Sequence, residues 1–195
     1  MVPRFPSAVH LTLIATLVLA LAGPGTRASA AAAAAGGLRE YEAKAIFVYN
    51  VLKFVEFPSA GLAPSAPLTV VVLSAAPLPE FSAALSGKTV KGHPIVVQGH
   101  ATLEKLGAPQ VVFIAADASK QLRDVIKAMQ GQPVLTVAEQ ATDGADLAGI
   151  AMGISDTRLT FEVNLDATET AGLQVSSGLL SLAKTVRGGK RRAER

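Results

Sequence analysis

The chain contains no cysteine and no tryptophan, and only three of its 195 residues are histidine. Without cysteine no disulfide can hold the fold, so the hydrophobic core has to hold it alone. His10, His93 and His100 are too scattered for the spacing of a transition-metal site, and there is no thiolate ligand. We therefore expect neither a metal nor any other cofactor.

Sequence motifs of catalysis are also missing. No Gly-x-Ser-x-Gly elbow occurs, and no serine, histidine and carboxylate are spaced as a nucleophilic site requires. The segment Ser86–Thr89 (SGKT) ends like a phosphate-binding loop, but Ser82 stands where that loop needs its first glycine. We therefore predict that the protein is not an enzyme.

Positive charge is scarce in the body of the chain, although the whole chain carries +3. Two of the bases, Arg4 and Arg27, lie within residues 1–30, and residues 187–195 carry five bases and one acid. The remaining body, residues 31–186, is therefore about −3. Since this body is not basic, nucleic acid is not an expected partner.

The N-terminus has the three parts of a secretory signal peptide. A base at Arg4 precedes the apolar run Leu11–Leu21, and Ala28–Ala30 provides a small-x-small cleavage site. We expect residues 1–30 to be a cleaved signal peptide and residues 31–38 a disordered Ala/Gly spacer. One domain should follow over residues 39–187, and residues 188–195 should form a disordered basic tail. The alternative is an uncleaved membrane anchor.

The segment Tyr41–Pro58 (YEAKAIFVYNVLKFVEFP) predicts a helix that ends before Pro58. Its apolar residues cover about half of the helical circumference, which indicates packing against a sheet. Phe54 lies on this wide face, so we expect Phe54→Ala to cost about 3–5 kcal/mol. A second, mixed face carries the residues Ile46, Tyr49, Asn50 and Lys53.

The middle of the chain predicts buried parallel strands. Continuous apolar runs occur at residues 68–73, 111–115 and 133–137, and residues 95–97 form a shorter one. A helix at residues 119–130 lies between two of these strands, and a short helix is expected at residues 79–85.

The last third of the chain predicts a hairpin and then helices. Residues 149–154 and 158–163 should form its strands, and the second strand alternates Leu159, Phe161 and Val163 with polar residues. Residues 166–172 predict a short helix, and residues 179–186 a last helix that Gly188–Gly189 should end. The predicted fold is a three-layer α/β sandwich, with a mostly parallel central sheet, an antiparallel edge hairpin and helices on both faces.

Five segments, in the same order along the chain, resemble the YfiR-like family of bacterial periplasmic proteins. They are residues 41–58, 87–95 (GKTVKGHPI), 133–137 (PVLTV), 158–164 (RLTFEVN) and 171–183 (AGLQVSSGLLSLA). The resemblance covers residues 40 to 186 and implies a non-enzymatic periplasmic regulator with an α/β sandwich fold. The namesake of the family has paired cysteines, so any redox control of that kind does not carry over to this chain.

The resemblance also implies partners. The namesake represses an inner-membrane diguanylate cyclase by binding its periplasmic domain, and an outer-membrane lipoprotein of the OmpA type can sequester it. It also forms dimers. We therefore expect a periplasmic domain of an inner-membrane signalling protein as the partner, with the lipoprotein and a homodimer as further expectations. Whether the partner is a cyclase or a histidine kinase stays open.

The predicted partner-binding surface consists of Ile46, Tyr49, Asn50, Lys53, Arg158 and Glu162. Tyrosine is favoured at protein interfaces because it buries area and keeps a polar tip. The alternative is that Tyr49 and Asn50 serve the packing of the domain itself. A second hypothesis for the whole protein is a periplasmic domain that binds a small molecule. The basic tail is expected to make weak contact with anionic membranes.

Overall fold

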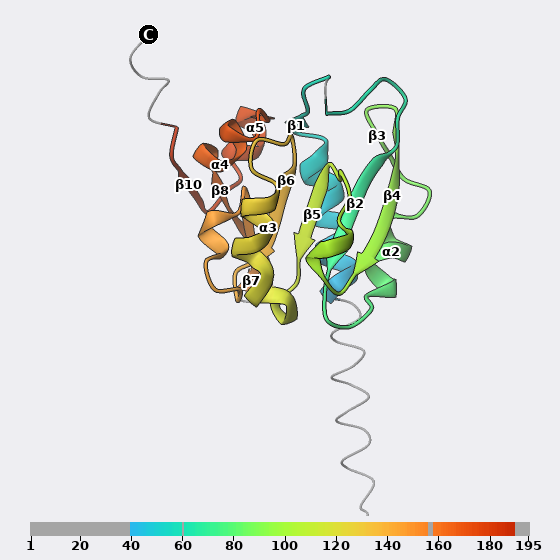
Figure 1. Cartoon of the computed structure of the whole chain (residues 1–195). Helices are drawn as coiled ribbons and strands as arrows, with labels where there is room; N and C mark the ends of the chain where they lie inside the picture. The colour runs from blue at the N-terminus through green and yellow to red at the C-terminus, as the bar shows by residue number, and fades with distance from the viewer. Residues whose placement is uncertain (1–39, 60, 156–157, 190–195) are drawn as a thin grey trace, which may run out of the picture. The chain divides into compact units, whose positions relative to one another are not determined.

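A computed structural model describes residues 40–59, 61–155 and 158–189 (Figure 1). The predicted signal peptide, the spacer and the last six residues of the tail lie outside the described residues. The first element described is a helix over residues 40–52, here called the N-terminal helix. The later helices are α2 (Pro79–Leu85), α3 (Leu122–Ala128), α4 (Leu165–Thr170) and α5 (Ser177–Leu180). Three 3-10 helices are η1 (Leu103–Lys105), η2 (Ala116–Gln121) and η3 (Ala145–Leu147).

The strands form one large sheet and one small one. The large sheet has the order β10-β8-β7-β6-β5-β2-β4-β3. Its strands are β2 (Leu68–Leu73), β3 (Thr89–Val90), β4 (His93–His100), β5 (Val111–Ile114), β6 (Leu135–Glu139), β7 (Ile150–Ser155), β8 (Arg158–Asn164) and β10 (Thr185–Arg187). The small sheet pairs β1 (Val55–Glu56) with β9 (Gln174–Val175) in antiparallel fashion.

The middle of the large sheet is parallel, because β4, β2, β5, β6 and β7 run in one direction. The hairpin of β7 and β8 is antiparallel, as predicted, and β10 adds a parallel strand outside β8. The chain passes from β2 to β4 on one side and then to β5 on the other. The order of the strands therefore reverses between β2 and β5, which is a topological switch point.

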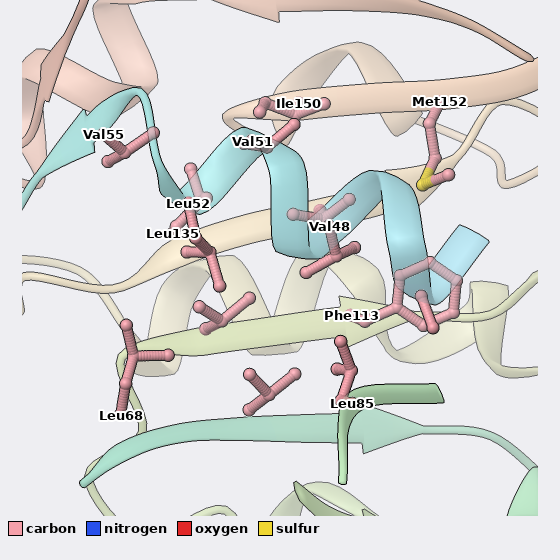
Figure 2. Close-up of a cluster of buried hydrophobic side chains, with 14 of the residues drawn as sticks. Val48, Val51, Leu52, Val55, Leu68, Leu85, Phe113, Leu135, Ile150 and Met152 are labelled. Carbon is pink, nitrogen blue, oxygen red and sulfur yellow. The ribbon is translucent and has the colours of Figure 1, made fainter. Parts of the chain in front are cut away.

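Helices cover both faces of the sheet, so the predicted α/β class and its layers are confirmed. The N-terminal helix and α2 pack on one face, where Val48 and Leu52 meet Phe113 and Leu135 (Figure 2). The helix α3 packs on the other face through Leu122 and Val125. Continuous apolar strands such as β5 are buried on both sides, because each side chain meets one layer or the other.

Two predicted helices end earlier than the sequence pattern indicates. The N-terminal helix stops at Leu52 and not before Pro58, because Val55 and Glu56 pair with β9. The backbone carbonyl of Phe54 also accepts a hydrogen bond from the N–H of Ser176 at 2.9 Å. A second correction concerns residues 179–186, where the predicted helix is only the four-residue α5 and the chain then enters β10.

The paired glycines follow β10 and therefore do not end a helix. Gly188 and Gly189 both adopt positive φ, and the N–H of Gly189 donates a hydrogen bond to Asp166 Oδ1 at 3.1 Å. This contact fixes the end of β10 to the start of α4. The described part of the C-terminal segment is therefore held to the domain at Gly189.

Candidate protein-binding groove

An open groove runs beside the N-terminal helix and has a volume of about 800 Å³. The helix forms one wall, and β8 with the segment after α5 forms the other. Most of its lining is apolar. The lining residues are Glu42, Ala43, Ile46, Phe47, Asn50, Val51, Phe54, Leu159, Phe161, Leu179 and Leu182.

The groove stays open because α5 is too short to cover β8. The strand alternates its side chains, so Leu159 and Phe161 point to the face of the N-terminal helix. Phe47 packs on Phe161 with their ring centroids 5.1 Å apart. The groove beyond this pair is open, and Leu182 is left 68% exposed.

Exposed apolar side chains gather on this face. The described residues include seven large apolar side chains that are exposed, and Ile46, Phe54 and Leu182 among them line the groove. Ile154 is the register partner of Leu159, and Val186 is the partner of the core residue Val163, so both lie on the same face. Five of the seven thus lie on one face at one end of the sheet, and exposed apolar patches of this kind are typical of interaction sites.

The exposure of Phe54 contradicts the expectation that it is buried. Its side chain is 37% exposed, because the helix ends two residues earlier and a turn carries Phe54 out of the apolar stripe. The ring lies against α5, where a Cβ added to Gly178 would be 3.6 Å from Phe54 Cε1. Phe54 is therefore a wall of the groove and not part of the core.

Two of the predicted partner-binding residues, Ile46 and Asn50, line the groove. Tyr49 and Lys53 are not among its lining residues. They contact each other, with Lys53 Nζ 4.1 Å from the centre of the Tyr49 ring, and Lys88 Nζ lies 5.2 Å from the same ring. Lys53 Nζ also donates a hydrogen bond to Asn50 Oδ1 at 2.9 Å. Ile46, Asn50 and Lys53 therefore form an exposed rim at the N-terminal helix, whereas Tyr49 is half-buried and also packs against the core.

The other two predicted residues are placed on the opposite face of the sheet. Glu162 alternates with Phe161 and accepts a hydrogen bond from Arg187 Nη2 at 2.7 Å. Arg187 also pairs with Asp146 at 3.4 Å. By the same alternation Arg158 shares the face of Glu162. The sheet thus separates Arg158 and Glu162 from the groove.

Sequence reasoning missed the residues that build the groove. It placed Leu159 and Phe161 on the apolar side of a strand and Phe54 on the apolar face of a helix, and it gave neither these residues nor Leu182 a part in a binding surface. Their apolar character was a correct signal for this face of the sheet. The sequence did not indicate how short α5 is, and the length of α5 decides how much of that face is covered.

A buried group of charges anchors the start of the N-terminal helix. Lys44 is only 3% exposed and Glu139, the last residue of β6, only 6%. Lys44 Nζ bonds Glu139 Oε2 at 2.8 Å and also pairs with Glu40. Burial, followed by the negative charge of Glu139, raises the pKa of Tyr41 above its ordinary value. Sequence reasoning missed this cluster, because Lys44 and Glu139 are far apart in the chain.

A smaller hollow of about 270 Å³ lies at the carboxyl ends of β2 and β4. Such a position favours ligands in open α/β sheets. Its lining is mostly apolar, however, and the hydroxyl of Ser74 is directed to Asp117 at 3.1 Å and to the carbonyl of Ala76 at 2.7 Å. Drug-sized ligands occupy pockets of about 300–1,000 Å³, so this hollow supports the small-molecule hypothesis less than the groove supports protein binding.

Some further observations hold for the described residues alone. Within residues 40–59, 61–155 and 158–189, no three His, Asp or Glu side chains gather as they would around a metal ion. In the same ranges, no helix has both the length and the apolar composition that crossing a bilayer demands.

The fold and the groove together define an α/β sandwich with an exposed apolar groove. The chain belongs to the YfiR/HmsC-like family, whose family model matches residues 41–184. This family comprises periplasmic regulators in cyclic-di-GMP signalling. The first matched residues are those of the N-terminal helix, which supplies one wall of the groove.

Proposed function

We propose that the protein is an exported, non-enzymatic regulator that represses an inner-membrane diguanylate cyclase by binding its periplasmic domain. The observation that supports this most is the open apolar groove, where Ile46, Phe54 and Leu182 stay exposed in the isolated chain. Exposed apolar patches of this kind mark protein interaction sites. Family membership supplies the class of partner.

The groove suits an apolar segment of a partner with polar contacts at its margin. Its lining includes Phe47, Leu159 and Phe161, which are half-buried or buried, and the exposed polar residues Glu42 and Asn50. A buried apolar centre with a polar rim is the usual anatomy of a protein interface. Aromatic side chains in the groove favour tight packing with the partner. Aromatic residues are common among those that contribute most of the binding energy of an interface.

The test is binding between the full-length chain and the periplasmic domain of an inner-membrane diguanylate cyclase of the same organism, measured by titration calorimetry. Leu182→Asp should weaken binding at least about tenfold, because it places a charge in the apolar interface. The matched control is Leu147→Asp, since Leu147 is 39% exposed on the opposite face of the sheet and lies outside the groove. Circular dichroism checks that both variants fold.

A cellular measurement tests repression separately from binding. Deletion of the gene should raise cyclic-di-GMP, and the Leu182→Asp variant should fail to lower it again while Leu147→Asp succeeds. Equal activity of the two variants would show that the groove does not act in repression. Binding to the periplasmic domain of a sensor kinase, with none to the cyclase, would replace the partner that we propose.

A further inference from the structure

Two lysines meet at one aromatic ring beside the groove. Lys53 follows the end of the N-terminal helix, and Lys88 lies in the turn between α2 and β3. Their Nζ atoms lie 4.1 Å and 5.2 Å from the centre of the Tyr49 ring. The two ammonium groups are therefore no farther apart than the sum of these distances. The fold thus gathers two positive charges that are distant in the chain.

The turn that carries Lys88 is the segment Ser86–Thr89, whose sequence is similar to the end of a phosphate-binding loop. Here it closes α2, because Lys88 N–H donates to the Leu85 carbonyl at 3.1 Å and Gly87 adopts a φ of 70°. This backbone N–H is already used, whereas a phosphate-binding loop turns such groups toward its ligand. What the segment offers is the side chain of Lys88, which reaches Tyr49.

Neither of the two lysines is neutralised by a carboxylate of the described chain. Their neighbour Lys91 shows the contrast, because it forms an ion pair with Glu56. Lys53 Nζ donates a hydrogen bond to Asn50 Oδ1, and the ion pairs among the described residues include neither Lys53 nor Lys88. An ammonium group has N–H donors and no acceptor, so the group that fits it is a negatively charged acceptor such as a carboxylate.

Tyr49 holds the two lysine side chains near one another before any partner binds. A free lysine side chain is flexible, and ordering it on binding costs entropy. Contact with the ring restricts both side chains, and the hydrogen bond to Asn50 restricts Lys53 further. The ring is fixed in turn, because Tyr49 is half-buried and packs against the core. An incoming anion therefore meets two cations that are already in place.

We propose that Lys53 and Lys88 bind an aspartate or glutamate side chain of the periplasmic domain that the protein represses. This inference rests on the function proposed above and adds the chemistry that the partner has to present. Asn50 connects the two regions, because it lines the groove and accepts the hydrogen bond from Lys53. The partner segment is then apolar where it fills the groove and acidic where it passes the end of the N-terminal helix.

An anionic membrane fits this place less well than a protein does. Basic segments that bind lipid head groups usually contain about four to eight Lys or Arg residues. Here only two gather, and two exposed acids lie close by, since Glu42 lines the groove and Glu56 lies on β1. A flat anionic surface would meet these acids together with the lysines. A single side chain of a protein reaches the lysines alone.

Charge reversal tests the proposal in the full-length chain. The probe is the periplasmic domain of an inner-membrane diguanylate cyclase of the same organism, and titration calorimetry gives the dissociation constant. Lys88→Glu should raise this constant about tenfold or more, because a carboxylate then faces a carboxylate. The matched control is Lys120→Glu, the same charge change at an exposed lysine of η2, which lies on the other face of the sheet with α3. The control should leave the constant unchanged, and circular dichroism checks that both variants fold.

Two further comparisons separate the charges from the ring that positions them. Tyr49→Phe keeps the ring face that attracts the ammonium groups, so it should bind as the unmodified chain does, whereas Tyr49→Leu should bind more weakly. Added salt should weaken binding of the unmodified chain, because it screens exposed charges. The double variant Lys53→Met/Lys88→Met should respond less to salt. An equal response of the two proteins would contradict a role for these charges.

A charge swap identifies the carboxylate on the other side. The exposed Asp and Glu residues of the cyclase domain are changed to lysine one at a time. One of these changes should weaken binding to the unmodified chain and restore binding to Lys88→Glu. Such a restoration requires that the two charges meet, because a variant that had merely lost its fold would not regain affinity.

The inference and the proposed function fail in different ways. If Lys88→Glu binds the cyclase domain as the unmodified chain does while Leu182→Asp does not, the lysine site is overturned and the groove remains. If Leu182→Asp binds normally and Lys88→Glu does not, the lysine site is supported and the groove loses its part. Vesicles of phosphatidylglycerol and phosphatidylcholine provide the last comparison. Weaker vesicle binding by Lys88→Glu, with unchanged affinity for the cyclase domain, would make this a lipid site and overturn the proposal.

Discussion

The first turns of the N-terminal helix and the turn that follows its end meet opposite surroundings. At the start a charged residue, Lys44, is 3% exposed and fastened to Glu139 on β6. After the end an aromatic residue, Phe54, is 37% exposed at the groove. The polarity of a side chain thus predicts its burial wrongly at both places. One end of this segment holds the domain together, and the other presents a surface.

Among the variants that test this contrast, Lys44→Met is expected to have the largest effect on stability. Loss of the ammonium group leaves the buried carboxylate of Glu139 without its cation, which costs about 3–5 kcal/mol of unfolding free energy. Urea denaturation measures the loss. The control Lys53→Met, on the exposed rim, should change stability by about 0.5 kcal/mol at most.

The double variant Lys44→Met/Glu139→Leu separates charge from packing. It removes both members of the pair, so it should recover much of the lost stability. A single Lys44→Met variant that unfolds at the same urea concentration as the unmodified chain would show that the start of the helix is not anchored by charge.

Truncation of two apolar residues compares the core with the groove directly. Leu52 is fully buried, so Leu52→Ala should lower the unfolding free energy by about 2–5 kcal/mol. Phe54→Ala should cost less, about 1–2 kcal/mol, because Phe54 is already 37% exposed to water. Equal losses in the two denaturation curves would place Phe54 in the core after all. In a titration with the partner domain the order of the two effects should reverse. Phe54→Ala should weaken binding more than Leu52→Ala does, because Phe54 lines the groove.

The smallest expected effect is the pH dependence at Tyr41. Its pKa is raised in the folded chain, so the folded state keeps this proton at pH values where the unfolded chain has lost it. The contribution is complete below about pH 10 and is lost as the pH rises above it. The melting temperature of Tyr41→Phe should therefore fall less steeply between pH 9 and pH 11. Parallel curves for the two proteins would contradict this.

Local patterns predicted most of the sheet. The runs at residues 68–73, 111–115 and 133–137 are rich in β-branched residues, and each overlaps a parallel strand of the sheet, although the third strand covers Leu135–Glu139 and so begins two residues later than predicted. The alternation from Leu159 to Val163 likewise predicted one strand of the hairpin. In these cases the residues that decide the structure are neighbours in the chain.

Such patterns did not predict contacts between residues that are far apart in the chain. The pairing of β1 with β9 ends the N-terminal helix early, and Val55 alone carries no sign of it. The strand β10 forms because Val186 meets Val163 across the sheet, although its own segment reads as helical. The separation of Glu162 from Asn50 by the sheet is likewise a property of the assembled fold. For the candidate site, sequence indicated the helix wall and missed the wall formed by β8 and α5.

The small sheet of β1 and β9 has a consequence for how the chain reaches its native state. Val55 pairs with Val175, so this contact closes a loop that contains nearly the whole domain. Closing such a loop costs entropy that only the surrounding packing can offset, and contacts of this kind slow folding. A chain that emerges N-terminus first presents its first helix long before β9 is available. Until the last segments arrive, the apolar stripe that includes Val51 and Leu52 has to be kept from aggregating.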